Sequence, residues 1–337
     1  MDHQQWSLRF GASVILCALL LRLMVSGFFQ PLAEFLAKPN IAAFLVYLET
    51  GRIVRFSQSS EVLEVFAYES ATPDFAQALS APERTIPTFC AQDADAVTFK
   101  NSAGKKFDAG ELITRPLTWN LTAGEPTVLI LHTHGTESYT RSDGEDYQES
   151  AAFRTLDDGY NMISVGDYLT QLLEAGGITV LHDREKHDYP SYSGSYSHAR
   201  KSIEGYLEEY PSICLVLDLH RDASADLNNQ MRTEATVDGE PSAQIMLVVG
   251  SNGTGLKHPN WEENLALALK LQVQLERRAP GICRKINLRG QRFNQDESPG
   301  ALIVEVGAAG NTHPEALKAM EVLAQAILDL AGGAETS

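Results

Sequence analysis

The feature that most constrains the fold is an apolar run, Thr127–Leu131, that leads directly into His132-Thr-His-Gly-Thr-Glu-Ser-Tyr139. A short run rich in β-branched and aliphatic residues is typical of a buried strand. Two later runs, Ile213–Leu219 and Ala301–Val304, are followed in the same way by His220-Arg-Asp222 and by Glu305. Because ligands in α/β proteins gather beyond the carboxyl ends of strands, we expect these strand ends to lie together.

From Glu125 onward, strand and helix patterns alternate. Helices that start with capping-box patterns are predicted from Asn260 and from Thr312. The alternation predicts an α/β domain over residues 125–332, with a mainly parallel sheet and helices on both faces. The predicted helices cover residues 157–174, 194–209, 260–278 and 312–331, and the further strands cover 178–181, 244–249 and 285–288.

The N-terminal part of the chain shows two different patterns. Leu8–Phe29 is mostly apolar and long enough to cross a bilayer, with Arg22 able to snorkel towards one face. Because no clean signal-peptide cleavage site follows, residues 1–30 are interpreted as a transmembrane signal anchor, with a buried core helix as the alternative. Residues 31–124 are interrupted by prolines, which indicates a membrane-proximal stalk or small module.

Composition excludes several classes of function. The net charge of −17 argues against nucleic acid, whose phosphates require lysine and arginine, and against an anionic membrane surface. The four cysteines show no metal-binding spacing and are interpreted as unpaired. The chain has no G-x-S-x-G elbow, no Walker loop and no H-E-x-x-H motif. Serine–histidine–aspartate catalysis is therefore unsupported by any motif.

Histidine placement points to a metal. Of the nine histidines, His132, His134 and His220 follow apolar strands, where a solvated histidine is not expected. Imidazole and carboxylate groups are the ligands that zinc takes from proteins. Glu137 and Glu305 also follow these strands. The three histidines are therefore interpreted as part of a zinc site, in preference to hydrogen-bonded histidines of the core.

Glu305 is the candidate for acid–base chemistry. It follows an apolar strand, and Gly307 leaves room beside it. A catalytic zinc site uses three protein ligands, and a further carboxylate can move a proton from water to the leaving amine. The alternative is that Glu305 is a buried carboxylate paired with Arg221 or Arg292, since an unpaired buried charge is costly.

At these residues the chain resembles the stage II sporulation protein P family, zinc-dependent peptidoglycan hydrolases of endospore-forming bacteria. The resemblance extends from Thr127 to Ala331, and its specificity comes from several long motifs in one order. These motifs are Leu131-His-Thr-His-Gly-Thr-Glu-Ser-Tyr139, Asp188-Tyr-Pro-Ser-Tyr-Ser-Gly-Ser-Tyr196, Leu217-Asp-Leu-His-Arg-Asp222, Lys257-His-Pro-Asn-Trp-Glu-Glu-Asn264, Arg292-Phe-Asn-Gln295 and Ser298-Pro-Gly-Ala-Leu-Ile-Val-Glu-Val-Gly307.

The resemblance implies an N-acetylmuramoyl-L-alanine amidase with a second activity on cross-linked stem peptides. It implies septal wall thinning during engulfment, beside the lytic transglycosylase SpoIID and other engulfment proteins. The expected location is the cell membrane, single-pass, with the catalytic domain on the extracytoplasmic side. The rival hypothesis is a non-catalytic scaffold that binds peptidoglycan with the same fold. Zinc content separates the two, because only the enzyme requires the metal.

The resemblance also implies roles for particular residues. His134 or His132 would be the first zinc ligand, His220 the second histidine, and Glu305 the catalytic carboxylate. Related amidases place the glutamate ligand further along the chain, so the choice between Glu137, Glu145 and Glu149 stays open. The expected substrate-binding or supporting residues are Arg221, Asp222, Asn294, Asn311 and Tyr192. For Asn311 a pure helix cap, and for Tyr192 packing at a helix start, are the alternatives.

Overall fold

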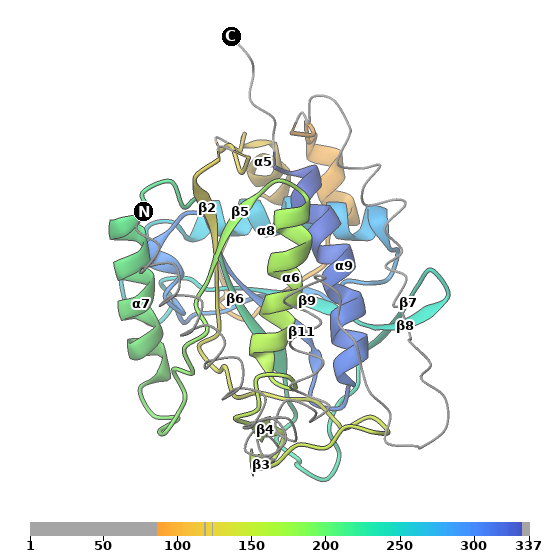
Figure 1. Cartoon of the computed structure of the whole chain (residues 1–337). Coiled ribbons are helices and arrows are strands. Elements are labelled where there is room, and N and C mark those ends of the chain that lie inside the picture. Colours follow the sequence, from red (N-terminus) through yellow and green to blue (C-terminus); the bar gives the residue numbers. More distant parts are fainter. Residues whose placement is uncertain (1–85, 118, 123, 332–337) are drawn as a thin grey trace, which may run out of the picture. The chain divides into compact units, whose positions relative to one another are not determined.

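The computed structural model describes residues 86–331, except 118 and 123 (Figure 1). The predicted signal anchor, residues 1–30, and most of the predicted stalk lie outside the described residues. Among the helices that are described, none combines the length and the apolar character needed to cross a membrane. The predicted anchor therefore stays a prediction.

The centre of the fold is a seven-stranded sheet in the order β1-β10-β9-β11-β6-β2-β5. Every neighbouring pair of strands is parallel except β9 and β11. The predicted α/β class with a mainly parallel sheet is thus confirmed. The strands are β1 (Phe99–Asn101), β2 (Pro126–Leu131), β5 (Thr179–His182), β6 (Leu215–Asp222), β9 (Ile245–Val249), β10 (Ile286–Leu288) and β11 (Ala301–Ala308).

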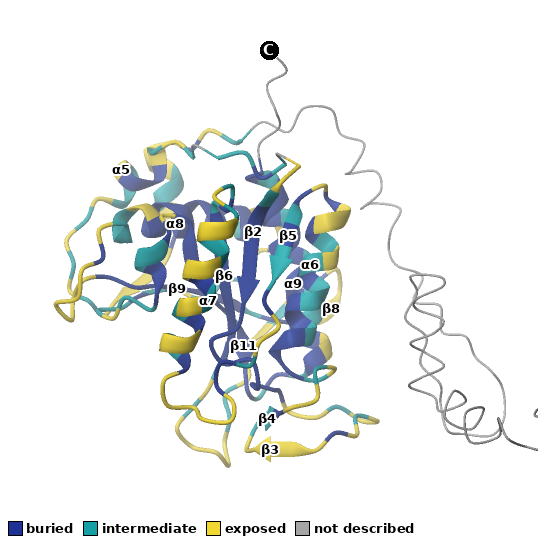
Figure 2. Ribbon diagram, turned by 60° about the vertical axis from the view of Figure 1, so that its left-hand side comes forward, coloured by how far each residue is buried: buried dark blue, intermediate teal, exposed yellow. Residues whose placement is uncertain are grey.

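The helices cover the two faces of this sheet unequally. α6 (Met162–Ala175), α8 (Trp261–Arg278) and α9 (His313–Asp329) pack in the main core with one face, whereas α7 (Ser195–Glu209) packs on the other. In Figure 1, α6 and α9 lie together on one side of β2, and α7 lies on the other. Strand alternation produces this division, because successive side chains of a strand point to opposite faces. Figure 2 shows that the outer side of α7 is exposed.

The remaining elements are short and lie outside the main sheet and its covering helices. They are the 3₁₀ helices η1 (Ala91–Ala96) and η2 (Gln295–Glu297), α5 (Ala109–Thr114), and the two-stranded pairs β3 (Glu149–Ala151) with β4 (Arg154–Thr155) and β7 (Glu234–Val237) with β8 (Glu240–Ala243).

The folded unit begins before the boundary expected at residue 125. β1 is the edge strand of the main sheet and pairs with β10, and α5 packs against α8. Ile113 and Leu121 are fully buried in the main core. A strand of three exposed residues and a helix of six are too short to show a periodic pattern, which is why the sequence did not reveal them.

The observed helix starts agree only in part with the starts predicted from the sequence. The last helix has the predicted capping box between Thr312 and Glu315. α6 begins at Met162, later than predicted, with Asn161 accepting a hydrogen bond from the backbone of Ile163. Asn260 occupies the N-cap of α8 but makes no side-chain capping hydrogen bond, so the predicted capping box there is absent.

Candidate active site

Strand register brings the predicted site residues together. β2 and β6 are parallel neighbours, with Leu131 opposite Asp218. β6 and β11 are also parallel, and Glu305 lies opposite His220. Because paired residues on adjacent parallel strands point to the same face, Glu305 and His220 share one side of the sheet. This is the side on which α7 packs.

His134 lies on the turn after β2 and is almost fully buried. Its ring stacks on Tyr192, with 4.5 Å between ring centroids, and meets the His220 ring edge-on at 5.3 Å. Its buried Nδ1 atom has no hydrogen-bond partner among the described residues. Burial lowers the pKa of His134 to about 4, so the ring is neutral near neutral pH and keeps one unprotonated nitrogen.

Glu137 is a buried carboxylate held by two arginines. Its Oε1 atom lies 3.3 Å from Arg154 Nη2 and 3.5 Å from Arg221 Nη1. Its Oε2 atom accepts the backbone N–H of Arg221 at 3.3 Å and lies 3.7 Å from Nδ1 of His220. Although burial alone would raise it, the surrounding cations hold the pKa of Glu137 below its ordinary value, so this side chain stays ionised.

His220 is oriented from behind by Asp218. Nε2 of His220 lies 2.9 Å from Oδ1 of Asp218, an ion pair without hydrogen-bond alignment. Asp218 is fixed in turn by the backbone N–H of Thr133 at 2.7 Å and its hydroxyl at 2.6 Å. Burial opposes the charged ring, but the neighbouring carboxylates raise the pKa of His220 to about 10. The site therefore favours a positive charge at this point.

His132 lies on the opposite side of the sheet, against α6. Its Nδ1 atom donates to the carbonyl of Leu219 at 3.2 Å, and its Nε2 atom lies 2.8 Å from Nε2 of His182. Gly166 of α6 makes room for this pair, because a Cβ atom there would lie 2.6 Å from His132 Nε2. Burial, with His182 as its neighbour, lowers the pKa of His132 to about 3. Both ring nitrogens are therefore engaged in the fold.

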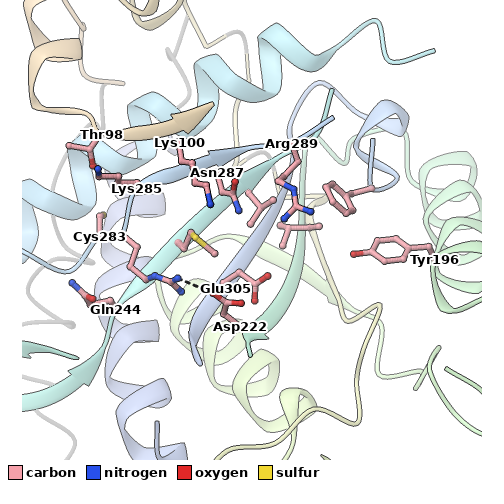
Figure 3. Close-up of a pocket in the computed structure, with 15 residues that line it drawn as sticks. Thr98, Lys100, Tyr196, Asp222, Gln244, Cys283, Lys285, Asn287, Arg289 and Glu305 are labelled. Carbon is pink, nitrogen blue, oxygen red and sulfur yellow. Dashed lines mark ion pairs between the residues drawn. The ribbon is translucent and has the colours of Figure 1, made fainter. Parts of the chain in front are cut away.

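Glu305 is partly buried and lines a pocket of about 740 Å³ (Figure 3). Its buried Oε2 atom has no hydrogen-bond partner in the described part of the chain. The two arginines considered as partners are engaged elsewhere: Arg221 with Glu137, and Arg292 with Asp296 at 2.9 Å. Burial, reinforced by nearby carboxylates, raises the pKa of Glu305 to about 8. A carboxyl group with such a pKa can both take and release a proton near neutral pH.

Arg221 and Asp222 support the site from β6. Nε of Arg221 donates to the carbonyl of Ser138 at 3.0 Å, and Nη2 donates to that of Phe153 at 2.9 Å. The guanidinium group thereby ties two loops to the end of the sheet. Asp222 pairs with Arg284 at 2.9 Å and lines the same pocket as Glu305.

The two predicted asparagines are both structural clamps. Asn294, in the left-handed conformation, donates to the carbonyl of Tyr196 at 2.7 Å. Asn311 is fully buried and bonds the backbone of Thr233 through both ends of its amide, and it also donates to Glu315 at 2.8 Å. Asn294 thus positions a tyrosine that lines the pocket, and Asn311 fixes the start of α9.

Tyr192 and Arg154 border the site on its exposed side. Tyr192 is 59% exposed although its ring stacks on His134, so part of the side chain stays accessible to solvent. Arg154 lies 5.0 Å from the Tyr192 ring, contacts Glu137 and forms a 2.5 Å ion pair with Asp188. Arg154 was not singled out from the sequence, because its segment lacks a periodic pattern.

The alternative glutamates lie elsewhere. Glu145 accepts the backbone N–H of Ser142 at 3.0 Å within its own loop. Glu149 is exposed on the short strand β3. Of the three glutamates considered as ligands, Glu137 is the one that contacts His220 in the structure.

The chemistry of the donor set fits zinc. His134 and His220 supply imidazole nitrogens and Glu137 a carboxylate, and Asp218 stands behind His220 as an orienting carboxylate. As the side chains lie, no group of three or more His, Cys, Asp or Glu in residues 86–331 is already arranged around a metal position. Glu137 shares its oxygens with two arginines in this arrangement.

Sequence comparison identifies one family. The model of the family described as Stage II sporulation protein P (SpoIIP) matches residues 57–328. The stage II sporulation protein P of Bacillus subtilis (strain 168) is 28% identical over 230 residues, which cover 64% of this chain and 53% of that protein. The chain thus spans about half the length of this relative.

Solved structures with a similar outline include two amidases. The CwlD amidase of Clostridioides difficile, solved in complex with the GerS lipoprotein, shares 11% identity over 61% of this chain and 95% of its own, with a TM-score of 0.37. The N-acetylmuramoyl-L-alanine amidase AmiC2 of Nostoc punctiforme shares 15% identity over 61% and 94%, with a TM-score of 0.35.

Proposed function

Because the chain belongs to the stage II sporulation protein P family, we propose that it hydrolyses peptidoglycan as an N-acetylmuramoyl-L-alanine amidase that also cuts cross-linked stem peptides. The observation that carries this proposal is that His134 and Glu137, on the turn after β2, lie beside His220 of β6, which is paired with Glu305 of β11. Three of them offer metal donors and the fourth an unpaired carboxyl group. The proposed setting is the septal wall during sporulation.

We infer that His134, Glu137 and His220 hold a zinc ion. When bound, zinc supplies a Lewis acid that polarises the scissile carbonyl. Asp218 keeps the His220 ring oriented so that Nδ1 faces Glu137. Burial keeps His134 neutral, as a nitrogen ligand must be. His220 would have to release, on metal binding, the proton that its neighbouring carboxylates hold.

Glu305 is proposed to move the proton. Its Oε2 atom takes a proton from the attacking water and delivers it to the nitrogen of the leaving amine, which balances the cleavage of the amide bond. The raised pKa of Glu305 suits both proton uptake and proton release, because a carboxyl group with a pKa of about 8 can exchange its proton near neutral pH. A bound cation nearby would lower this pKa somewhat.

The setting of the enzyme is part of the same proposal. We propose that the apolar segment Leu8–Phe29 anchors the chain in the cell membrane with the catalytic domain on the extracytoplasmic side. The lytic transglycosylase SpoIID is the proposed neighbour, since cutting glycan and peptide together would thin the wall faster than either alone.

The proposal is tested with the purified full chain and isolated sacculi. Zinc-loaded protein should release peptides that carry a new amino terminus, chelation should abolish the release, and added zinc should restore it. The non-catalytic scaffold predicts a different result. A folded, zinc-supplied chain that binds sacculi but releases no peptide would overturn the proposed hydrolase and favour the scaffold.

A further inference from the structure

Within residues 86–331, the sheet face that carries Glu305 is covered over only part of its width. α7 packs over β2 and β6 through Ala199 and Ile203. Beyond β11 the same face opens into the pocket of about 740 Å³, which extends over β9 and β10 to the edge strand β1. Figure 3 shows this pocket, with Glu305 and Asp222 side by side among the residues that line it. The open face is therefore continuous with the proposed catalytic carboxyl group.

The floor of the pocket is apolar. Met246, Val248 and Ile303 form a small buried cluster on this face. Tyr196 and Phe293 pack against the cluster, with 5.7 Å between their ring centroids. A floor of this kind suits the short aliphatic side chains and backbone of an extended peptide.

The outer wall of the pocket comes from β10 and is polar. Ile286 and Leu288 are fully buried on the opposite face, so the alternation of the strand turns Lys285, Asn287 and Arg289 into the pocket. The Oδ1 atom of Asn287 is buried and has no hydrogen-bond partner among the described residues. Figure 3 shows Asn287 and Arg289 on the side of the pocket away from Glu305.

The cations of this wall are unpaired. No ion pair or hydrogen bond joins the side chains of Lys100, Lys285 or Arg289 to another residue in the described part of the chain. Arg284, at the same pocket, instead pairs with Asp222. Two of these cations flank β10 and the third, Lys100, is on the neighbouring strand β1. Their lack of an acidic partner among the described residues is notable in a chain whose net charge is −17. Cations without a partner favour the binding of carboxylates.

We propose that this open face binds a peptide carrying several carboxylates, with Lys100, Lys285 and Arg289 as the anion-binding side chains. The inference rests on the proposed function. It adds the place on the protein where the stem peptide of the substrate, with its carboxylates, would bind. Lys285 and Arg289 are four residues apart on an extended strand, about 13 Å, which is the length of an extended peptide of about four residues. The net charge of −17 disfavours long polyanions as the occupant.

Binding is measured on full-length Glu305→Gln, which is expected to bind without turnover. The probes are muropeptides released from sacculi by a muramidase, used before and after chemical amidation of their carboxyl groups. Amidation should weaken binding by about 10–100-fold, as should the double variant Lys285→Gln/Arg289→Gln. The matched control is Lys201→Gln, an exposed lysine on α7, which should bind as the parent does. Added salt should weaken binding of the unmodified probe only.

Steady-state kinetics of the chain with Glu305 intact provide a second test. Lys285→Gln, whose side chain is exposed, should raise KM and leave kcat nearly unchanged, whereas Lys201→Gln should change neither. The inference would be overturned if native and amidated muropeptides bound equally well, or if Lys285→Gln left KM unchanged. If the wild type still hydrolysed peptidoglycan in that case, the proposed function would stand. Charge-dependent binding by a wild type that cuts no bond would instead overturn the proposed function alone.

Discussion

Two histidines separated by one residue have different surroundings in this structure. His134 lies between Tyr192 and His220 with a free Nδ1 atom, whereas His132 uses both ring nitrogens within the fold. The turn after β2 separates them, sending one ring to α6 and the other to the α7 side. The sequence could select this pair because both follow a buried strand. It could not choose between them, because the choice depends on the path of the turn and on His182, fifty residues away.

His134→Ala and His132→Ala should therefore differ in metal content. His134→Ala should lose zinc, because a proposed ligand is removed. His132→Ala should keep zinc but lower the free energy of unfolding by about 1–3 kcal/mol, because a buried partner of His182 is lost. Zinc analysis and denaturant unfolding of both variants provide the measurement. Loss of zinc in His132→Ala alone would reverse the assignment.

Gly166 provides a steric test of the histidine pair. A methyl group at this position would lie 2.5 Å from Nε2 of His182 and 2.6 Å from Nε2 of His132. Gly166→Ala should therefore destabilise the protein by about 1–3 kcal/mol, although alanine is the better helix former. The matched control is Gly205→Ala in α7, where a Cβ atom would meet nothing within 4 Å beyond the local helix backbone, and a gain of about 0.5–1 kcal/mol is expected. Equal melting temperatures for both variants would contradict the close packing at Gly166.

Among the elements, α8 carries a buried lysine that has no carboxylate partner in the described residues. Nζ of Lys270 donates to the carbonyl of Leu112 at 3.3 Å and lies 3.5 Å from that of Ala266. Burial, with Arg115 nearby, lowers the pKa of Lys270 to about 8. The Leu112 carbonyl also accepts the backbone N–H of Arg115, so it would keep a partner if the lysine were replaced.

Lys270→Met should stabilise the protein in a pH-dependent way. The folded pKa of about 8 lies below the ordinary value of 10.5, so the folded protein binds this proton less tightly than the unfolded chain. The wild type should therefore gain stability from this group as the pH rises from about 8 towards 10.5, and Lys270→Met should be the more stable protein below that range. Urea unfolding of both proteins across this range is the measurement, with exposed Lys201→Met as the control. A Lys270→Met variant that is less stable throughout would show that the lysine contacts outweigh desolvation.

Element prediction succeeded where a pattern was long enough. The long helices and the strands that enter the site follow hydrophobic periodicity, and the capping box at Thr312 is present as predicted. β1 and α5 were missed, because three and six residues carry no period. At Asn260 the local pattern predicted a cap, but the side chain instead donates to the carbonyl of Asp296. A tertiary contact thus replaced the local one, which sequence alone does not reveal.

At the scale of the whole molecule, the segment before residue 125 completes the fold. β1 extends the sheet, and Ile113 and Leu121 fill the main core. The fragment 125–337 should therefore be far less stable than the fragment 86–337. Removing several buried apolar side chains, at about 1.5–3 kcal/mol each, would consume most of the stability of an ordinary domain. Thermal unfolding of the two fragments tests this, and equal melting temperatures would contradict a structural role for the segment.

The arrangement of the whole molecule also explains why the site lies where it does. Among the described elements, α6, α8 and α9 pack on one face of the sheet, and α7 covers part of the other. The uncovered part begins at Glu305, so the proposed catalytic carboxyl group stands between a buried donor cluster and an open pocket. Strand ends and candidate residues were predictable from the sequence, whereas this unequal coverage depends on packing between distant elements.

The most direct test of the account is Glu305→Gln, with peptide release from sacculi and zinc content measured on the same preparation. The amide keeps the shape of the side chain but cannot take a proton from water. Turnover should fall by about 10²–10⁴-fold while zinc content, fold and muropeptide binding stay as in the wild type. Loss of zinc together with activity would make Glu305 a ligand. Full activity with zinc retained would contradict its role in proton transfer and direct attention to Glu137.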